Sequence, residues 1–322
     1  MRRKIFGTRS SWATLLLLCA GSLALADESV QARAEIRIMS WNIADGAFVT
    51  HPAEFRSLLL YSGANVLLLD EVAPSAGPEQ LRRVLVEPES WQLDFGTSGG
   101  RQRGVIASRM PLEALPEFAS ILPYPEADQR EIRDRMPPAA RNYRAWSMDG
   151  GIPVHGALVH TAGRRLLVVV ADLQCCGNEP GSWQEFKRQI ETAEIQKRVR
   201  QVLDRIQVDG IVLAGDFNLV NTPIPLTILA GPYQAPHLLL TPAEPYHLDG
   251  TTNWTWDGRG TPFPSGALDY QLYSSHSLGI AASLVLDTED LSDEELELSG
   301  LKSNTSRQLS DHRPLIVEYS WH

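Results

Sequence analysis

Apolar runs alternate with amphipathic stretches along most of this chain. The runs are short, rich in Leu, Val and Ile, and bounded by Gly, Pro or polar residues, which is typical of buried β-strands. Stretches between them carry apolar residues at helical spacing, which predicts helices that cover the faces of a sheet. The pattern therefore predicts an α/β fold. The expected strands are residues 35–40, 65–69, 91–95, 104–108, 166–171, 210–214, 268–273 and 314–319, with a further apolar strand flanked by His155 and His160. The expected helices are residues 52–61, 78–86 and 183–206.

Local signals mark the ends of the expected helices. Gly63 stops the first helix, and Pro78 stands at a first-turn position of the second. Ser182 and Glu185 have the spacing of a capping box, which satisfies exposed backbone N–H groups at a helix start. We therefore expect the third helix to begin directly after Ser182.

The first 26 residues have the pattern of a secretory signal peptide. A basic start is followed by mostly apolar residues 12–25, and a small-residue cleavage site ends at Ala26. A transmembrane anchor is the alternative, but the apolar stretch is short, and no later stretch is apolar enough to span a bilayer. We expect residues 27–322 to form a single domain, secreted or periplasmic, with no obligate protein partner evident.

The charge of the chain limits its partners. The sequence has 29 basic and 39 acidic residues, a formal net charge of −10 and a pI near 5.3. Cleavage of the signal would remove four basic residues and no acids, which leaves 25 against 39, a net charge of −14. Such a chain does not adhere broadly to nucleic acid. A nuclease is still compatible with this charge, because a divalent cation in the cleft offsets local carboxylates.

The chain has three cysteines. Cys19 lies in the expected signal peptide, so the mature chain keeps only the neighbours Cys175 and Cys176. An exported protein meets oxidising conditions, under which these two could form a vicinal disulfide that stiffens their loop. Two idle thiols are the alternative, and the sequence does not decide between them.

Four short polar motifs each follow an apolar run, where the open end of an α/β sheet presents side chains to a ligand. They are residues 40–42, 70–71, 215–218 and 310–312. Their oxygen-rich side chains suit a hard cation, Mg²⁺ or Mn²⁺. Glu71 is the expected primary metal ligand, Asn42 offers a neutral carbonyl for the metal or its water, and Asp311 is a further candidate ligand.

Two further pairs indicate catalytic chemistry. Asp216 and Asn218 stand two apart in an extended segment, so both side chains can point to one face. Asp269 and His312 suit a carboxylate–imidazole pair, in which the carboxylate fixes the tautomer and favours the imidazole cation. The other ring nitrogen would then face a phosphate, as a general base or as a stabiliser of developing charge.

Taken together, these motifs resemble the endonuclease/exonuclease/phosphatase superfamily, with its deoxyribonuclease I-like fold. The resemblance covers essentially the whole mature chain. It implies a four-layer sandwich of two central mixed β-sheets flanked by helices, classed as α/β or, in some schemes, α+β. The matching motifs are residues 39–42, 69–72, 104–111, 215–218, 268–270 and 310–314.

The resemblance also implies metal-assisted phosphoester hydrolysis. In the family, the residue matching Asp216 orients or deprotonates the attacking water, and the one matching Asn218 steadies the phosphate. One departure stands out, because many members carry a general-acid His where this chain has Asp172. Asp172 could donate a proton, bind metal or merely cap its loop. Other branches use a Tyr there and an Asn a few residues on, a role that Asn178 could serve.

Several residues bear on the substrate. Arg101 and Arg103 lie in a glycine-rich turn and are candidate phosphate-binding residues. The Arg- and Pro-rich segment 130–144 and the dense acidic run 287–297 are each most simply a solvated loop or helix face. Near the cleft, the Arg-rich segment could also bind phosphate. Trp254 and Trp256 could stack on a base or sugar, but core packing is the more common role of Trp.

These features favour a secreted, Mg²⁺-dependent phosphodiesterase, with a nuclease acting on DNA or RNA as the leading interpretation. A sphingomyelinase-like or inositol-phosphate-like phosphatase on the same scaffold is the first alternative, and the net negative charge mildly favours it. A catalytically silent module that binds a phosphorylated ligand is the second, motivated by the departure at Asp172.

Overall fold

The structure is a computed structural model that describes residues 36–97, 102–141, 147–177, 179–233 and 235–322. The expected signal peptide and the candidate substrate-binding residues Arg101 and Asn178 lie outside the described residues. Along the described chain, no helix is long and apolar enough to cross a membrane.

The described strands form two six-stranded sheets, called sheet A and sheet B. Across sheet A the order is β11 (Leu278–Val285), β12 (Leu315–Trp321), β1 (Ile36–Asp45), β2 (Val66–Val72), β4 (Arg103–Ser108) and β3 (Gln92–Phe95). Across sheet B the order is β5 (Leu112–Ala114), β6 (Val154–Thr161), β7 (Arg164–Ala171), β8 (Gly210–Asp216), β10 (Asp269–Ser274) and β9 (Leu240–Pro242). Both sheets are mixed, because β1–β2 and β7–β8 are parallel and the other pairs are antiparallel.

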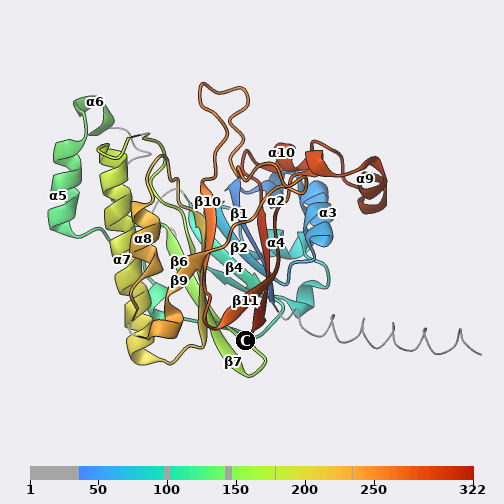
Figure 1. Ribbon diagram of the computed structural model, residues 1–322, viewed down its shortest axis with the longest axis horizontal. Coiled ribbons are helices and arrows are strands. Elements are labelled where there is room, and N and C mark those ends of the chain that lie inside the picture. Colours follow the sequence, from blue (N-terminus) through green and yellow to red (C-terminus); the bar gives the residue numbers. More distant parts are fainter. Residues whose placement is uncertain (1–35, 98–101, 142–146, 178, 234) are drawn as a thin grey trace, which may run out of the picture.

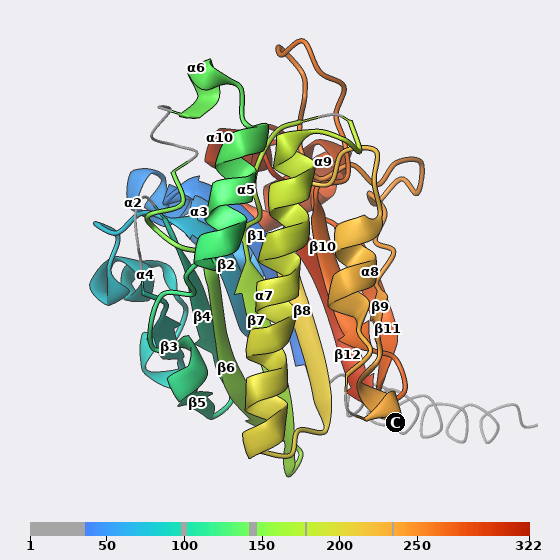
Figure 2. The same cartoon turned by 90° about the vertical axis from the view of Figure 1, so that its left-hand side faces the viewer.

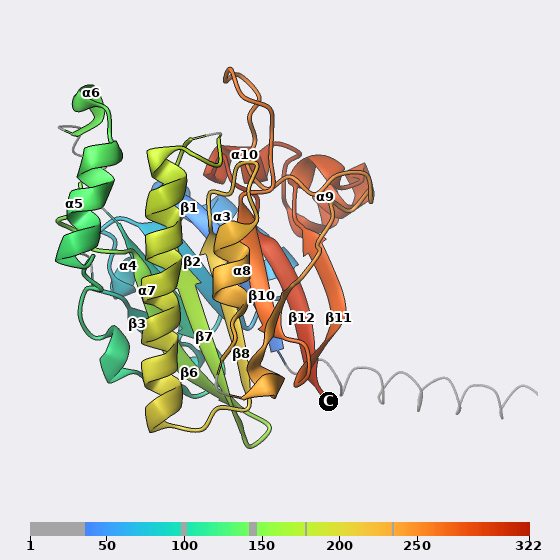
Figure 3. The same cartoon turned by 60° about the vertical axis from the view of Figure 1, so that its left-hand side comes forward.

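Helices cover the outer face of each sheet, as Figures 1 and 2 show from two sides. Sheet A is covered by α2 (Ala47–Thr50), α3 (Pro52–Ser62), α4 (Pro78–Val84) and α10 (Thr305–Leu309), with α9 (Asp293–Ser299) beyond them. Sheet B is covered by α7 (Trp183–Arg205) and α8 (Ile224–Ala230), with α5 (Glu126–Arg135) and α6 (Pro138–Arg141) outside α7 (Figure 3). Short 3₁₀ turns are η1 (Pro88–Ser90), η2 (Pro116–Phe118), η4 (Pro236–Leu238) and η5 (Thr288–Asp290).

Side-chain alternation along the strands gives three buried cores. Ile38 and Leu68 of sheet A meet Val168 and Val212 of sheet B in the core between the sheets. The opposite faces of the two sheets pack against the helices that cover them. The result is helix, sheet, sheet, helix, which confirms the predicted four-layer sandwich.

All the expected strands and helices are present, but several strands run further than predicted, and two of these extensions carry site residues. β1 continues to Asp45 and β2 to Val72, so Asn42 and Glu71 lie within strands rather than beyond them. Register shifts in both strands keep the pairing going after the apolar pattern ends. The strands β5, β9 and β11 were not predicted, because β5 and β9 are only three residues long and β11 is largely half-exposed.

The predicted capping box at α7 is half formed. Ser182 Oγ accepts a hydrogen bond from the backbone N of Glu185 at 3.2 Å. The Glu185 carboxylate does not accept a hydrogen bond from the backbone N of Ser182. It accepts hydrogen bonds from Arg188 Nε at 3.0 Å and Thr222 Oγ1 at 3.1 Å instead. A buried Arg188 therefore takes the carboxylate that an exposed helix start would have used.

The two charged segments are mainly solvated, as expected. In the Arg-rich one, Arg130 and Arg135 pair with acids one turn earlier on the same helix. In the acidic one, Asp287 is an exception to the prediction, since it is only 1% exposed and accepts a hydrogen bond from Arg313. A carboxylate in a charged run is buried here because a buried cation needs it.

Candidate active site

The predicted site residues converge at one edge of the sandwich. The carboxyl ends of the parallel pairs β1–β2 and β7–β8 meet there with the amino ends of β10 and β12. Asn42 is the register partner of Asp70, and Asp216 is the register partner of Asp269. Because the two sheets face each other, these neighbours share one small volume.

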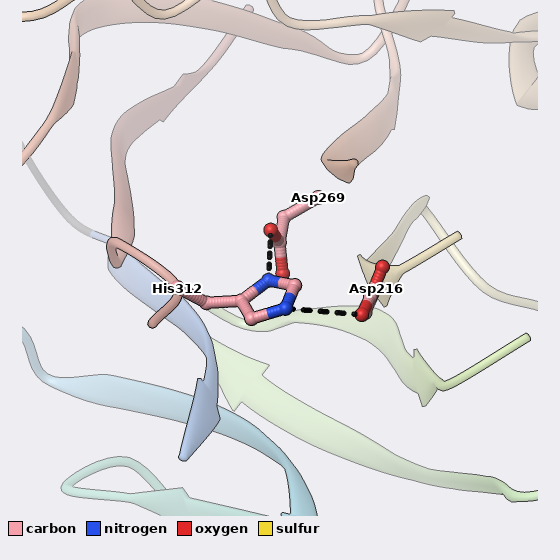
Figure 4. Close-up of side chains that lie close together, drawn as sticks. All are labelled: Asp216, Asp269 and His312. Carbon is pink, nitrogen blue, oxygen red and sulfur yellow. Dashed lines mark hydrogen bonds and ion pairs between the residues drawn. The ribbon is translucent and has the colours of Figure 1, made fainter. Parts of the chain in front are cut away.

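His312 lies between two buried aspartates (Figure 4). Its Nδ1 is 2.7 Å from Asp269 Oδ2, and its Nε2 is 3.6 Å from Asp216 Oδ2. All three residues are at least nine-tenths buried, and one nitrogen or oxygen from each lies within 4.8 Å of the others. The ring is thus held in one orientation, with one edge on each carboxylate.

Burial and neighbouring charges shift the pKa values of Asp216 and His312. Burial raises the pKa of the Asp216 carboxyl to about 8; the His312 imidazole opposes the shift, and Asp269 and Glu71 add to it. For His312, burial lowers the pKa, but Asp269 and Asp216 outweigh it and hold the pKa well above its usual value. The imidazole therefore favours its cation between the two carboxylates.

Neighbouring polar groups hold Asp216 in place. Asn42 Nδ2 donates to Asp216 Oδ2 at 3.1 Å, and the backbone N of Asn218 donates to Asp216 Oδ1 at 2.9 Å. The backbone N of Asp216 donates to Asp70 Oδ2 at 3.1 Å. Asn218 Nδ2 donates to the Leu173 carbonyl at 3.0 Å, which joins this strand end to the loop after β7.

Gly215 is required by the close approach of β7 in its own sheet and of Asp70 from the other sheet. Its φ is +131°, and a Cβ there would lie 2.1 Å from the Ala171 carbonyl oxygen and 2.8 Å from Asp70 Oδ2. Any side chain would push Asp70 away from the backbone N of Asp216. The Gly before Asp216 is thus part of the site's construction.

Glu71 occupies a strained position at a β-bulge. Its φ is +49°, in the left-handed region, and the pairing of β2 with β4 shifts register around it. Its Oε2 accepts a hydrogen bond from Gln102 Nε2 at 2.8 Å. The bulge turns the side chain out of the regular alternation, and its charge acts on Asp70, Asp172 and Asp216.

Asp311 lies beside His312 at the exposed rim. Its Oδ2 accepts a hydrogen bond from Trp256 Nε1 at 3.0 Å, and its carbonyl accepts one from the backbone N of Asp257 at 2.8 Å. Its charge adds to the upward shift in the pKa of His312. The other carboxylate oxygen of Asp311 thereby has a fixed direction.

Asp172 and Arg103 line a small pocket with Asp70 and Glu71. Burial, then Glu71 and Asp216, raise the pKa of Asp172 well above its usual value. Arg103 Nη2 donates to the Ala76 carbonyl at 2.7 Å. The guanidinium is thus engaged with backbone beside the pocket.

The donor set fits a hard divalent cation. Oδ1 of Asp70 and Oδ1 of Asp269 are buried without a hydrogen-bond partner among the described residues. Burial first, and then repulsion between the crowded carboxylates, raise the pKa values of Asp70, Asp172 and Asp216. A cation bound among the carboxylates at this edge would relieve the repulsion, and oxygen ligands are those that Mg²⁺ and Mn²⁺ prefer.

A family profile described as "Endonuclease/Exonuclease/phosphatase family" matches residues 39–312, which span this whole site. The chain belongs to this family. Its members are phosphoester hydrolases, so the site lies where that chemistry is expected. Among curated proteins, none matches the chain significantly.

Solved structures share the fold at low sequence identity. The human Nocturnin catalytic domain with bound sulfate is 18% identical with a TM-score of 0.54, and the match covers 90% of this chain and 96% of that one. D. rerio TDP2 complexed with single-strand DNA product is 15% identical with a TM-score of 0.52, covering 89% and 99%. An endonuclease/exonuclease/phosphatase from Bacteroides vulgatus is 11% identical with a TM-score of 0.56, covering 89% and 99%.

The structure thus brings most of the predicted site residues together. Hydrogen bonds or ion pairs connect Asn42, Asp216, Asn218, Asp269 and His312. Glu71 and Asp172 act on this group through charge, and Asp311 adjoins it. Arg103 contacts the pocket, whereas Arg101 and Asn178 lie outside the described residues.

Two contacts at the site were not predicted from the sequence. Asp70 holds the backbone of Asp216; its position at the end of an apolar run was the available signal. Trp256 binds Asp311 through its indole N–H, and no local pattern predicts that contact. Trp254 packs against His247, with ring centroids 4.4 Å apart.

Proposed function

We propose that this chain is a secreted, Mg²⁺-dependent phosphodiesterase whose leading substrate is DNA or RNA. The observation that carries the proposal is the buried array of Asp216, His312 and Asp269, with His312 directed at both carboxylates. Packing for stability alone rarely gathers two buried aspartates around a histidine, whereas acid–base catalysis requires such groups.

The reaction is in-line attack of water on phosphorus. The Asp216 carboxylate orients the water and accepts its proton. The His312 imidazolium, fixed by Asp269, stabilises the negative charge that develops on the phosphoryl oxygens. Mg²⁺ held by Glu71 and Asp311, with Asn42 or its water, would neutralise the phosphate and the leaving oxygen.

Two further residues complete the roles. Asn218, which donates one amide hydrogen to the Leu173 carbonyl, keeps a second hydrogen with which to steady a phosphoryl oxygen. Asp172 supplies the proton to the leaving oxygen, because its raised pKa keeps the carboxyl protonated at higher pH. An acid of this type replaces the His found in many family members.

Nucleic acid is the leading substrate because the fold neighbours include a TDP2 complexed with single-strand DNA product. Arg103, and Arg101 and Asn178 beyond the described residues, are the proposed contacts to the phosphates. Small phosphoesters are a second candidate. The acidic pocket around Asp70, Glu71 and Asp172 repels a long polyanion, and another neighbour is ANGEL2, described as a 2',3'-cyclic phosphatase.

The test is a screen of DNA, RNA, cyclic nucleotides, sphingomyelin and sugar phosphates, with Mg²⁺ and with EDTA. We expect hydrolysis of at least one phosphodiester with Mg²⁺ and none with EDTA. His312→Ala should lower kcat by about 10²–10⁴-fold. His160→Ala is the matched control, since His160 lies in the exposed part of β6, 2.9 Å from Glu113, and should leave turnover unchanged.

The alternatives give different results in the same screen. Undiminished turnover in His312→Ala would remove His312 from the mechanism. Selective hydrolysis of sphingomyelin or sugar phosphates would replace the nuclease assignment by the sphingomyelinase-like or inositol-phosphate-like one. Retention of a phosphorylated ligand with no product over long incubation would identify a catalytically silent binding module.

Export is part of the proposal and rests on the N-terminal sequence pattern. Expressed with its own signal in a bacterium, the chain should be recovered outside the cytoplasm with Asp27 as its first residue. N-terminal sequencing of the exported protein measures this. A mature protein that retains residues 1–26 would contradict signal cleavage.

A further inference from the structure

The thiols of Cys175 and Cys176 lie on the same side of an exposed loop. The loop joins β7 to α7, both cysteines are exposed, and no disulfide joins them. Their Sγ atoms are 2.9 Å apart. Adjacent side chains of an extended segment point to opposite sides, but Cys176 has a φ of +71°, which turns the two sulfurs together. The structure therefore contains a preformed dithiol.

Buried charged groups of α7 hold this loop rigid. Arg188, which is fully buried, donates from Nη1 to the carbonyls of Gln174 at 2.8 Å and Cys176 at 2.7 Å, on either side of Cys175. Glu191 Oε2 accepts a hydrogen bond from the backbone N of Gln174 at 2.8 Å. Lys187 Nζ donates to Gln174 Oε1 at 2.6 Å. These contacts fix the backbone on both sides of Cys175.

The neighbouring Cys175, and after it Arg188 of α7, favour the reactive form of Cys176. The hydrogen bond with Cys175 and then the positive charge of Arg188 lower the pKa of Cys176 to about 7, against burial, which raises it. Arg188 Nη2 is buried without a hydrogen-bond partner among the described residues, so part of its charge is not neutralised by a neighbour. At neutral pH a substantial fraction of Cys176 is thiolate, the form that binds soft centres.

We propose that Cys175 and Cys176 form a binding site for a trivalent arsenical, a small pyramidal and strongly thiophilic centre. The short separation of the two sulfurs favours one coordination geometry of the bound centre over others. Tetrahedral Zn²⁺, with bonds of about 2.3 Å, places two sulfurs roughly 3.8 Å apart. A linear two-coordinate ion needs them further apart still. A pyramidal centre with nearly perpendicular bonds needs the smallest separation and only two protein ligands.

The binding step needs no oxidant. With phenylarsine oxide as the ligand, two S–As bonds form and the bonds between arsenic and its oxygen break. The two thiol protons go to that oxygen, which leaves as one water. Arsenic remains trivalent and both sulfurs keep their oxidation state. The Cys176 thiolate attacks first, and Cys175, already 2.9 Å away, closes the ring.

The test uses the full chain with Cys19→Ser throughout, so that the only thiols are the two in question. The reduced protein is mixed with phenylarsine oxide and its intact mass is measured in excess monothiol. We expect one adduct per chain, lost on adding a dithiol. Cys175→Ser and Cys176→Ser each leave one thiol, and should bind about 100-fold more weakly because the chelate is broken.

The pH dependence provides an independent measurement. In the chain that keeps both Cys175 and Cys176, the rate at which iodoacetamide alkylates Cys176 should rise with pH through about 7, since the thiolate forms there. An ordinary thiol would show the rise near 8.5. Equal retention of phenylarsine oxide by the intact pair and by either single variant would overturn the proposal, as would absence of an adduct on the reduced chain. Neither result depends on phosphoester hydrolysis, so the two proposals are tested separately.

Discussion

The carboxylates of this site differ because their surroundings differ. Asp269 is placed by its hydrogen bond with His312, and Asp216 is placed by Asn42 and the backbone of Asn218. Asp311 lies at the exposed rim, where its orientation depends on one indole N–H from Trp256. A hydrogen bond to a charged group contributes about 1.5–3 kcal/mol, enough to hold an exposed carboxylate in one direction.

Trp256→Phe should weaken Mg²⁺ binding while keeping the aromatic ring. The substitution removes the N–H that orients Asp311, and losses of this kind typically cost about 10–100-fold in metal affinity. Mg²⁺ dependence of activity, together with Mn²⁺ binding measured by electron paramagnetic resonance, would show it. Trp254→Phe is the matched control, since its ring lies against His247 and not on Asp311. Unchanged metal binding in Trp256→Phe would mean that Asp311 is not oriented by the indole.

At the scale of elements, residues 255–257 connect the strand that carries Asp269 with the loop that carries His312. Thr255 Oγ1 accepts hydrogen bonds from the backbone N of Leu268 and Asp269, at the start of β10. The Thr255 carbonyl accepts one from the backbone N of Arg313, just before β12. A single segment thus sets the distance between Asp269 on sheet B and His312 on sheet A.

The buried side chain of Arg313 stabilises the position of these segments. Its side chain is fully buried and donates to Asp287 Oδ2 at 2.7 Å, Asp257 Oδ2 at 2.9 Å and the Ser310 carbonyl at 3.2 Å. These partners come from three loops around the amino end of β12. Arg313 therefore holds the loop that carries His312.

Arg313→Ala should lower the free energy of unfolding by about 3–5 kcal/mol, because it leaves two buried carboxylates without their cation. Urea denaturation measures the loss. Arg259→Ala is the control, because Arg259 binds the same Asp257 from a half-exposed position, where such pairs contribute about 1 kcal/mol or less. Equal losses in the two variants would contradict a special role for the buried cation.

At the scale of the whole molecule, repulsion between the carboxylates of the site destabilises the folded state. The two sheets press Asp70, Asp216 and Asp269 together at one edge, in a chain that already has a formal net charge of −10. Folding concentrates charges that the unfolded chain keeps apart. A cation that binds only the folded state should therefore stabilise the entire sandwich.

Mg²⁺ at about 100 times its dissociation constant should stabilise the folded chain by about 2.7 kcal/mol. Thermal unfolding with increasing Mg²⁺ measures this as a rise in Tm. Glu71→Gln should reduce the rise by removing a ligand charge. Glu113→Gln, which removes an exposed carboxylate paired with His160, should leave it intact. A Tm that does not respond to Mg²⁺ would count against a metal site among these residues.

Much of the fold could be predicted because its strands are long apolar runs with clear ends. The predictions failed for β5, β9 and β11, where the strands are short or half-exposed and pairing depends on neighbours. Asn42 and Glu71 were identified by residue type and position, but the extension of their strands depends on bulges that no periodicity encodes.

The sequence by itself determined which groups are available: the carboxylates, the imidazole, the two thiols and the apolar runs that must be buried. Burying those runs is enough to select the layers, because the hydrophobic effect acts on composition and spacing. Only the tertiary structure decided which groups meet. Asp216 and His312 are far apart along the chain, and their 3.6 Å approach depends on two sheets packing face to face with a glycine between them. Contacts of this length depend on the whole packed backbone, which no local stretch of sequence specifies.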